Sequence, residues 1–298
     1  MTDAGDGPRV VAAGRGASWW AAGFSLFTAS FWTWIGIMVI YIIITVLISA
    51  VPYVGSVGHW LLSPVFMGGL MLGCRALDRG EPLRVAHLFE GFQGTHFVPL
   101  MIIGAVNIAI TLGIAALAVV GVAGSLKLAD LATIGSGGDP FDALTRSLGD
   151  AGGASLLMSL LVLVFIAVFA MLNWFAPALV ALQGTTAVDA MKRSFVACLR
   201  NWVPFLVYGL IAVGVLVAAV LAFGAIALAL GAGALFGGGN GGNAGNWIAM
   251  AAVLFVLFLL ALAVVALFVG PVVFGSTYAG YKDTLARDDP AAVDPAYR

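Results

Sequence analysis

Charged side chains are missing from most of this 298-residue sequence. No Asp, Glu, Lys or Arg lies between Asn201 and Tyr281, and three further uncharged blocks cover 16–74, 91–126 and 151–188. A charged residue at the centre of a bilayer costs roughly 2.5–3.5 kcal/mol on insertion scales. Only 9% of the residues are charged and 62% are hydrophobic, whereas soluble domains carry roughly 25% charged residues. The sequence is therefore typical of a polytopic membrane protein.

The scarcity of charge also removes most side chains that catalysis needs. The three histidines, His59, His87 and His96, lie in different segments without Cys, Asp or Glu at the spacing of metal ligands. No serine stands in a nucleophile elbow. We therefore expect no enzyme, no metal site and no bound cofactor.

Two further absences narrow the class of protein. The net charge of −1 offers no basic surface, so a nucleic-acid partner is not expected. Cys74 and Cys198 are the only cysteines, and each stands beside a cationic segment, so a structural disulfide is not expected either. We interpret both cysteines as packing residues.

The long apolar runs predict six membrane-spanning helices. A span needs about 20 apolar residues, and these runs lack the alternating pattern of barrel strands. The fold class is therefore an all-α membrane protein, predicted as a single transmembrane domain over 1–298, with flexible segments at 1–16 and 283–298. The spans are placed near 31–51, 57–76, 97–121, 155–182, 202–230 and 247–280.

The distribution of cations predicts the orientation of these spans. Of the 13 Lys and Arg residues, 11 lie in the two terminal segments or in the second and fourth connections. The other side of the membrane would carry only Lys127 and Arg146. The positive-inside rule then places both termini and the connections 77–95 and 184–200 in the cytoplasm of a bacterium, with the spans in its inner membrane.

A hairpin unit is repeated three times along the chain. Each unit has an amphipathic stretch, an aromatic residue at the start of one span, and a proline in the next span. The best match pairs SPVFMGGLMLGCR (63–75) without gaps with GPVVFGSTYAGYK (270–282). The repeat predicts a fold of three related hairpins with short amphipathic helices at the cytoplasmic interface.

Small residues and prolines in the second span of each unit predict close packing and kinks. Small residues spaced by four let helix backbones approach closely, and proline removes a backbone hydrogen bond. The contacts form either within one chain or between copies, and the kinks are either static or hinges for transport. The residues concerned are Pro64, Gly69, Gly73, Pro177, Pro271, Ser276 and Gly280.

Two asparagines stand out among the polar residues inside the spans. Asn107 and Asn173 each lie about ten residues from the cytoplasmic end of their span, or roughly 15 Å deep by helical rise. We expect them to meet as an intramembrane polar pair, through a direct or water-bridged hydrogen bond. Such a pair either holds two helices together or lines a path for a ligand.

Two cytoplasmic segments predict amphipathic helices in the headgroup plane. In 81–93 the apolar residues Val85, Leu88, Phe89 and Phe92 share one face. In 186–200 a capping box begins a second helix, with Val188, Met191, Phe195 and Leu199 on one face. Either both helices are connectors beneath the bundle, or Arg84, Lys192 and Arg193 bind anionic lipids or a partner.

The chain resembles known proteins in the segments GRGASWW, GFSLF and LLSPVFMGGLMLGCRALDRGEPLRVAHLFEGF (61–92). These are similar to a proteobacterial family of six-span inner-membrane proteins with no assigned activity. The repeated unit more loosely resembles YciC-like proteins and the membrane anchor of some bacterial glycerophosphodiester phosphodiesterases. The sequence shows no catalytic domain after its last span, so the resemblance implies a fold and a location without that activity.

Two functions fit these observations. The first is a non-catalytic protein that organises the lipid bilayer or scaffolds a partner, either an unknown protein or a second copy of the chain. The alternative is a transporter or permease for a neutral or amphipathic small molecule. A continuous polar cavity between the hairpins would favour transport, and a solid core with an exposed apolar groove would favour scaffolding.

Overall fold

A computed structural model describes residues 7–52, 54–125, 139, 152–236 and 244–286 of the chain. All regular elements within these residues are helices, and six candidate spans are long and apolar enough to cross a membrane. The all-α class and the six spans predicted from the sequence are thereby confirmed.

Six long helices form three hairpins. They are α2 (Phe31–Ser49) with α3 (Val54–Asp78), α5 (Phe97–Ser125) with α8 (Gly152–Asn173), and α11 (Trp202–Phe236) with α12 (Ala244–Thr284). Short helices connect or precede the hairpins: α1 (Arg15–Ala29), α4 (His87–Glu90), η1 (Gly94–His96), α9 (Ala176–Gln183) and α10 (Ala187–Arg200).

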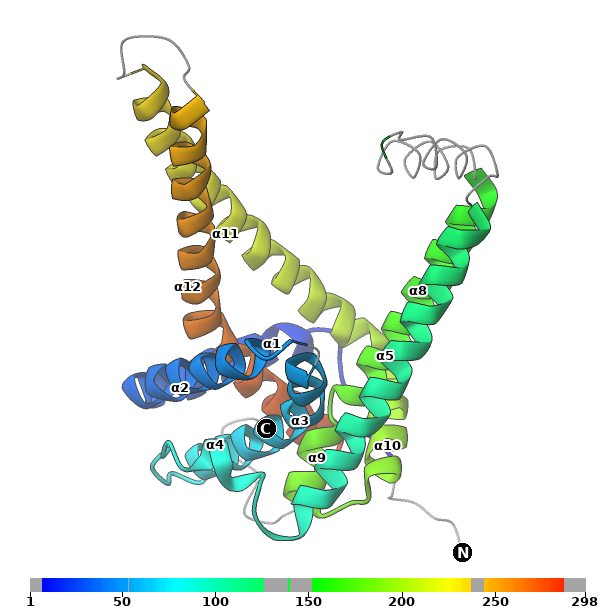
Figure 1. Ribbon diagram of the computed structural model, residues 1–298. Coiled ribbons are helices and arrows are strands. Elements are labelled where there is room, and N and C mark those ends of the chain that lie inside the picture. The colour runs from blue at the N-terminus through cyan, green and yellow to red at the C-terminus, as the bar shows by residue number, and fades with distance from the viewer. Residues whose placement is uncertain (1–6, 53, 126–138, 140–151, 237–243, 287–298) are drawn as a thin grey trace, which may run out of the picture.

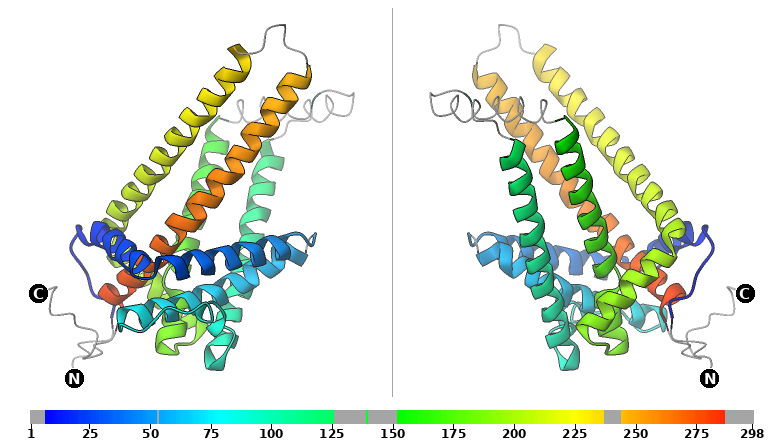
Figure 2. Two further views of the ribbon diagram at one scale, coloured as in Figure 1. Left: turned by 90° about the vertical axis from the view of Figure 1, so that its left-hand side faces the viewer. Right: turned by 90° about the vertical axis from the view of Figure 1, so that its right-hand side faces the viewer.

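The three hairpins diverge from a shared base (Figures 1 and 2). The base contains α1, α4, α9 and α10, and the hydrophobic core lies there around Trp34, Val65 and Phe175. In the most apolar 18 residues of the α3 span, 61% are buried, compared with 6% in the most apolar 18 residues of the α11 span. Most of the span surface is therefore left uncovered by the described part of the chain, and α3 is the central helix.

The short helices give the base a cyclic order. Helix α4 packs against α3, and α10 packs against α8 and α9, so each contacts the second half of the hairpin before it. Helix α1 packs against α12 of the last hairpin and thereby closes the ring. The two ends of the described chain meet at this closure, where the backbone N–H of Arg9 donates to the carbonyl oxygen of Thr284 over 2.8 Å.

This closure differs from the flexible segments expected at 1–16 and 283–298. Residues 9–15 bind α12 and Asn201, and Leu285 is buried in the core. The difference arises because charged and backbone groups of these segments find partners in each other, which hydropathy alone does not reveal. Residues 1–6 and 287–298 lie outside the described part of the chain.

The fourth predicted span, 155–182, is two helices instead of one. The Ser194 hydroxyl of α10 accepts from the Phe175 N–H over 3.0 Å and donates to the Met171 carbonyl over 2.7 Å. This hydroxyl takes the place of the hydrogen bond from residue 175 to residue 171, and the new helix α9 begins at Ala176 with Pro177 in its first turn. Helices α3 and α12 instead continue through Pro64 and Pro271.

The predicted amphipathic helix over 81–93 is also much shorter in the structure. Only His87–Glu90 is α-helical, and His87 and Leu88 are buried, while Val85 and Phe89 are exposed. The physical reason lies on α3, where Gly69 and Gly73 have no side chains and let the His87 backbone and ring approach. His87 therefore belongs to the packing face of this segment.

Helix α10 begins as predicted, with the Thr186 side chain accepting from the Asp189 N–H over 3.3 Å. Its buried face, however, differs from the expected one. Val188 and Leu199 are exposed on the same side as Lys192. The buried residues are mainly small: Ala187, Ala190, Met191, Ser194, Ala197 and Cys198. Small side chains allow α10 to lie close to the break between α8 and α9, and Val188 and Leu199 are left outside.

Candidate functional site

A cavity of about 210 Å³ lies where the three hairpins meet. Helices α2, α3, α5, α8, α9 and α12 all contribute to its wall, so residues far apart in the sequence surround one space. The lining residues are Tyr41, Ser63, Pro64, Met67, Leu70, Asn107, Asn173, Pro177 and Phe274. The wall is thus apolar except for two hydroxyl groups and two carboxamides.

The two asparagines singled out in the sequence both line this cavity. Asn107 is 6% exposed, and its Oδ1 atom has no hydrogen-bond partner. Asn173 donates through Nδ2 to the carbonyl oxygen of Phe169 on its own helix over 2.9 Å, and its Oδ1 atom also has no partner. The structure therefore brings both residues to one cavity without a direct hydrogen bond between them.

Tyr41 is the counterpart of Asn107 in the first hairpin. Each is the eleventh residue of its helix, counted from Phe31 and Phe97. The sequence comparison of the repeats did not extend to this position, although the spacing from the aromatic residue was available to find it. The first two hairpins thus each direct the eleventh residue of their first helix toward this cavity.

The three prolines differ in their positions relative to the cavity. Pro64 and Pro177 line it, whereas Pro271 is buried in α12 and its neighbour Phe274 reaches the wall. Pro177 stands at the start of α9.

The glycines singled out on α3 pack against α4 of the same chain. A Cβ atom on Gly69 would overlap the carbonyl oxygen of His87, and one on Gly91 would overlap that of Val65. A Cβ on Gly73 would lie 2.8 Å from the Leu83 side chain. Gly69 and Gly91 require glycine because backbone contacts backbone there, whereas Gly73 contacts only side chains.

The aligned positions on α12 repeat this contact with α1. A Cβ atom on Gly23 would overlap the carbonyl oxygen of Val272 and lie 2.7 Å from the backbone nitrogen of Ser276. The Ser276 hydroxyl also lies 2.8 Å from that of Tyr208 on α11. A Cβ on Gly280 would lie 3.3 Å from the Phe175 ring. Two of the three units therefore pair a glycine of the short helix with the same two positions of the neighbouring hairpin.

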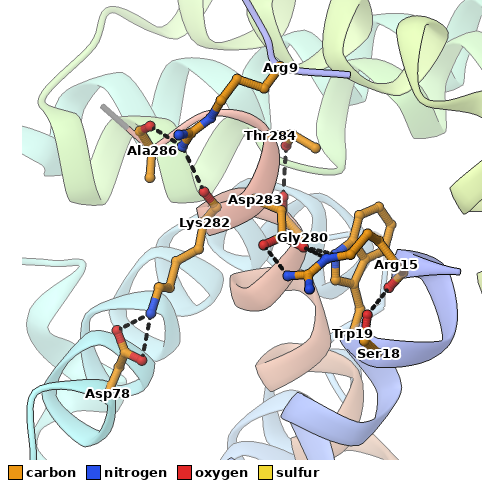
Figure 3. Close-up of polar contacts among 10 residues, drawn as sticks. All are labelled: Arg9, Arg15, Ser18, Trp19, Asp78, Gly280, Lys282, Asp283, Thr284 and Ala286. Atoms are coloured by element: carbon orange, nitrogen blue, oxygen red, sulfur yellow. Dashed lines mark hydrogen bonds and ion pairs between the residues drawn. The ribbon is translucent and has the colours of Figure 1, made fainter. Parts of the chain in front are cut away.

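Asp283 binds α1 to the end of α12 (Figure 3). Its carboxylate accepts from Nε of Arg15 over 2.8 Å and from Nε1 of Trp19 over 2.6 Å. Arg9 adds a bond from Nη2 to the carbonyl oxygen of Ala286 over 2.6 Å. Sequence reasoning missed this group, although an arginine just before the first apolar run and an aspartate just after the last one were visible.

Asp78 makes a second link between the first and last hairpins (Figure 3). Both of its carboxylate oxygens accept from Nζ of Lys282 over 2.8 Å, and Oδ2 also accepts from the Tyr278 hydroxyl over 3.0 Å. The two acidic residues thus join the base on either side of the end of α12: Asp283 of α12 binds α1, and Asp78 of α3 binds α12.

The three cations proposed to contact anionic lipid differ in their surroundings. The Arg84 and Lys192 side chains are exposed. Arg193 is half-buried and donates through Nη1 to Oε1 of Gln183 over 2.9 Å. Arg193 is therefore part of the packed base, and only the first two are placed freely at its surface.

Burial raises the pKa of the Cys198 thiol on α10 to about 12. The Sγ atom lies 3.7 Å from the Met171 carbonyl oxygen, next to the break between α8 and α9. At neutral pH this cysteine is a protonated packing group. Cys74 is likewise buried and free of any disulfide.

Comparison with known proteins gives one informative likeness. The chain is 27% identical over 227 residues to a probable inner membrane protein of Burkholderia thailandensis, across 75% of this chain and 82% of that protein. No family model matches the chain, and no solved structure matches it. The likeness supports an uncharacterised group of inner-membrane proteins, and the looser resemblance to YciC-like proteins is not shown.

Proposed function

We propose that this chain is a non-catalytic protein of the bacterial inner membrane that organises the lipid around it. The observation that carries the proposal is the divergence of three apolar hairpins from one packed base. Apolar surface such as Leu163 on α8 and Leu221 on α11 is exposed. In a membrane this surface is covered by lipid tails or by helices of another protein.

The likeness to a probable inner membrane protein supports the location, and the distribution of cations supports the orientation. With the base in the cytoplasm, Arg84 and Lys192 would face the anionic inner leaflet. Each cation near such a surface contributes about 1 kcal/mol of attraction. The exposed Val188 and Leu199 beside Lys192 would lie among the headgroups. The base would thus concentrate anionic lipid in the inner leaflet, while the diverging hairpins would hold lipid molecules in the spaces between them.

Extraction in polymer-bounded patches of native membrane tests this proposal. Lipid analysis of the patches is expected to show more anionic lipid than the bulk membrane, and less of this enrichment in Arg84→Gln/Lys192→Gln. Glu81→Gln is the matched control, because it removes an exposed anion from the same base and should not lower the enrichment. A lipid content equal to that of the bulk membrane, with no protein accompanying the chain, would contradict the proposal.

The cavity favours a second candidate, a transporter for a neutral or amphipathic molecule. Three hairpins surround this space, and two of its lining residues are prolines that could act as hinges. Proteoliposomes containing the protein would then move a fluorescent neutral amphiphile between leaflets faster than protein-free vesicles. Equal rates in both preparations would remove this candidate and leave the organising role.

A further inference from the structure

We propose that the central cavity binds the uncharged head group of an amphiphile, one that donates two hydrogen bonds to Asn107 and Asn173. A primary carboxamide or a vicinal diol on an apolar chain has this chemistry. The proposal rests on the cavity alone and does not depend on how the protein acts on the surrounding bilayer.

The side-chain oxygens of the two asparagines have no hydrogen-bond partners. Both Oδ1 atoms are buried without a donor, and both residues line the same space. A buried acceptor without a partner destabilises the folded state, and more so in surroundings that hold no water. Two such atoms at one cavity indicate a missing occupant with two donor hydrogens.

The lining residues also limit the charge of the occupant. All nine lining residues are uncharged. A cationic head group would therefore enter a cavity without a counter-ion, and an anionic one would meet two carbonyl oxygens. Both have a large desolvation cost in an apolar environment. A neutral donor group avoids this cost.

The size and the wall of the cavity favour an amphiphile over water. The cavity of about 210 Å³ is larger than one or two waters, each with a share of about 30 Å³ in the liquid. Most of its wall is apolar, with Met67, Leu70 and Phe274 among the lining residues. A head group followed by several methylene groups therefore suits the wall better than water does.

The test compares two amide probes, one with two donor hydrogens and one in which methyl groups replace both hydrogens. Dodecanamide carries two N–H hydrogens, and N,N-dimethyldodecanamide carries none while keeping the chain and the carbonyl group. Binding to the full chain in lipid nanodiscs is measured by native mass spectrometry at matched probe concentrations. We expect dodecanamide to bind at least about fivefold more tightly, as the loss of a hydrogen bond of about 1 kcal/mol implies. 1,2-Dodecanediol should bind like dodecanamide.

Variants connect the binding to the two asparagines. Asn107→Leu and Asn173→Leu should each abolish the preference for dodecanamide over its dimethyl analogue. The same changes should raise the unfolding temperature of the ligand-free protein, because each removes a buried acceptor without a partner. Thr111→Val is the matched control, since Thr111 lies on the same helix as Asn107 but outside the cavity wall.

Three results would overturn the proposal. The first is equal affinity for the two amides, because donors would then not matter. The second is an unchanged preference in both leucine variants, which would place the binding elsewhere. The third is a stable pair of waters on the two oxygens that saturating dodecanamide does not displace in a high-resolution structure.

Discussion

At the scale of single residues, glycine sets how closely the short helices approach the hairpins. Gly23 of α1 and Gly91, which directly follows α4, each lie against a backbone carbonyl, of Val272 and Val65 respectively, at aligned positions of α12 and α3. A methyl group at either position has no room unless the two helices separate. The van der Waals contacts along both helix pairs depend on this close approach, so the two glycines contribute to the stability of the fold.

Gly23→Ala is therefore expected to destabilise the protein by about 1–3 kcal/mol, the usual cost of overpacking. Gly209→Ala is the matched control, because nothing lies within 4 Å of a Cβ atom there and alanine favours the helix. Thermal unfolding of both variants in one detergent measures the difference. A Gly23→Ala protein as stable as the control would mean that α1 does not pack on α12 in this way.

The raised pKa of Cys198 predicts slow alkylation of this thiol. Alkylation requires the thiolate, and an exposed cysteine has a pKa of about 8.5. With a pKa of about 12, Cys198 at pH 8 should react with iodoacetamide about a hundredfold or more slowly than an exposed cysteine. Leu199→Cys supplies that comparison in the same helix, where the residue is 54% exposed. Peptide mass spectrometry resolves the two rates, and similar rates would contradict the burial of Cys198.

The same shift gives the sign of a pH effect on stability. Because the folded pKa of Cys198 is higher than the unfolded one, the unfolded chain releases a proton first as the pH rises. The contribution of this group to stability is therefore complete at neutral pH and is lost between about pH 8.5 and 12.

At the scale of elements, α1 is held to α12 by polar contacts as well as by close packing. Asp283→Asn removes the charge that Arg15 and Trp19 bind, and hydrogen bonds to charged groups contribute about 1.5–3 kcal/mol. We expect α1 to become accessible to limited proteolysis after Arg15 while the hairpins stay intact. Glu81→Gln, which changes an exposed acid elsewhere on the base, should leave the cleavage rate unchanged. Equal cleavage rates in the two variants would show that Asp283 does not hold α1.

The elements also show which features the sequence could predict. Apolar runs and the Thr186 cap are local signals, and α2, α10 and the six spans were found from them. The break at Phe175 depends on a hydroxyl from another helix, and the inward position of His87 depends on glycines of α3. Neither cause lies within the segment that it reshapes, so a reading of each segment alone could not find it.

At the scale of the whole molecule, the repeat explains the cyclic base. Each short helix contacts the second helix of the neighbouring hairpin, and the contact of α1 with α12 completes the order. Sequence reasoning identified the repeat and the two asparagines, because matched depth on antiparallel spans is a one-dimensional property. The cyclic closure and the participation of Tyr41 and Phe274 in the cavity depend on how the three hairpins turn about the base. That arrangement is a property of the assembled molecule.

The divergence of the hairpins is the central claim, because it leaves the spans to lipid or to a partner. Distances between spin labels test it most directly, in lipid nanodiscs and in a background with Cys74→Ala and Cys198→Ala. Labels at the exposed residues Val46, Leu160 and Leu221 report on one hairpin each, and Val46 with Val57 reports within the first hairpin.

The distances between labels on different hairpins are expected to be much longer than the one within the first hairpin. Helix axes in a packed pair lie only about 8–10 Å apart, so a closed bundle would hold neighbouring hairpins at similarly short distances. Longer distances between all three hairpins would support surfaces covered by lipid or by a partner. Distances between hairpins as short as the distance within one would contradict the divergent structure and the organising function proposed from it.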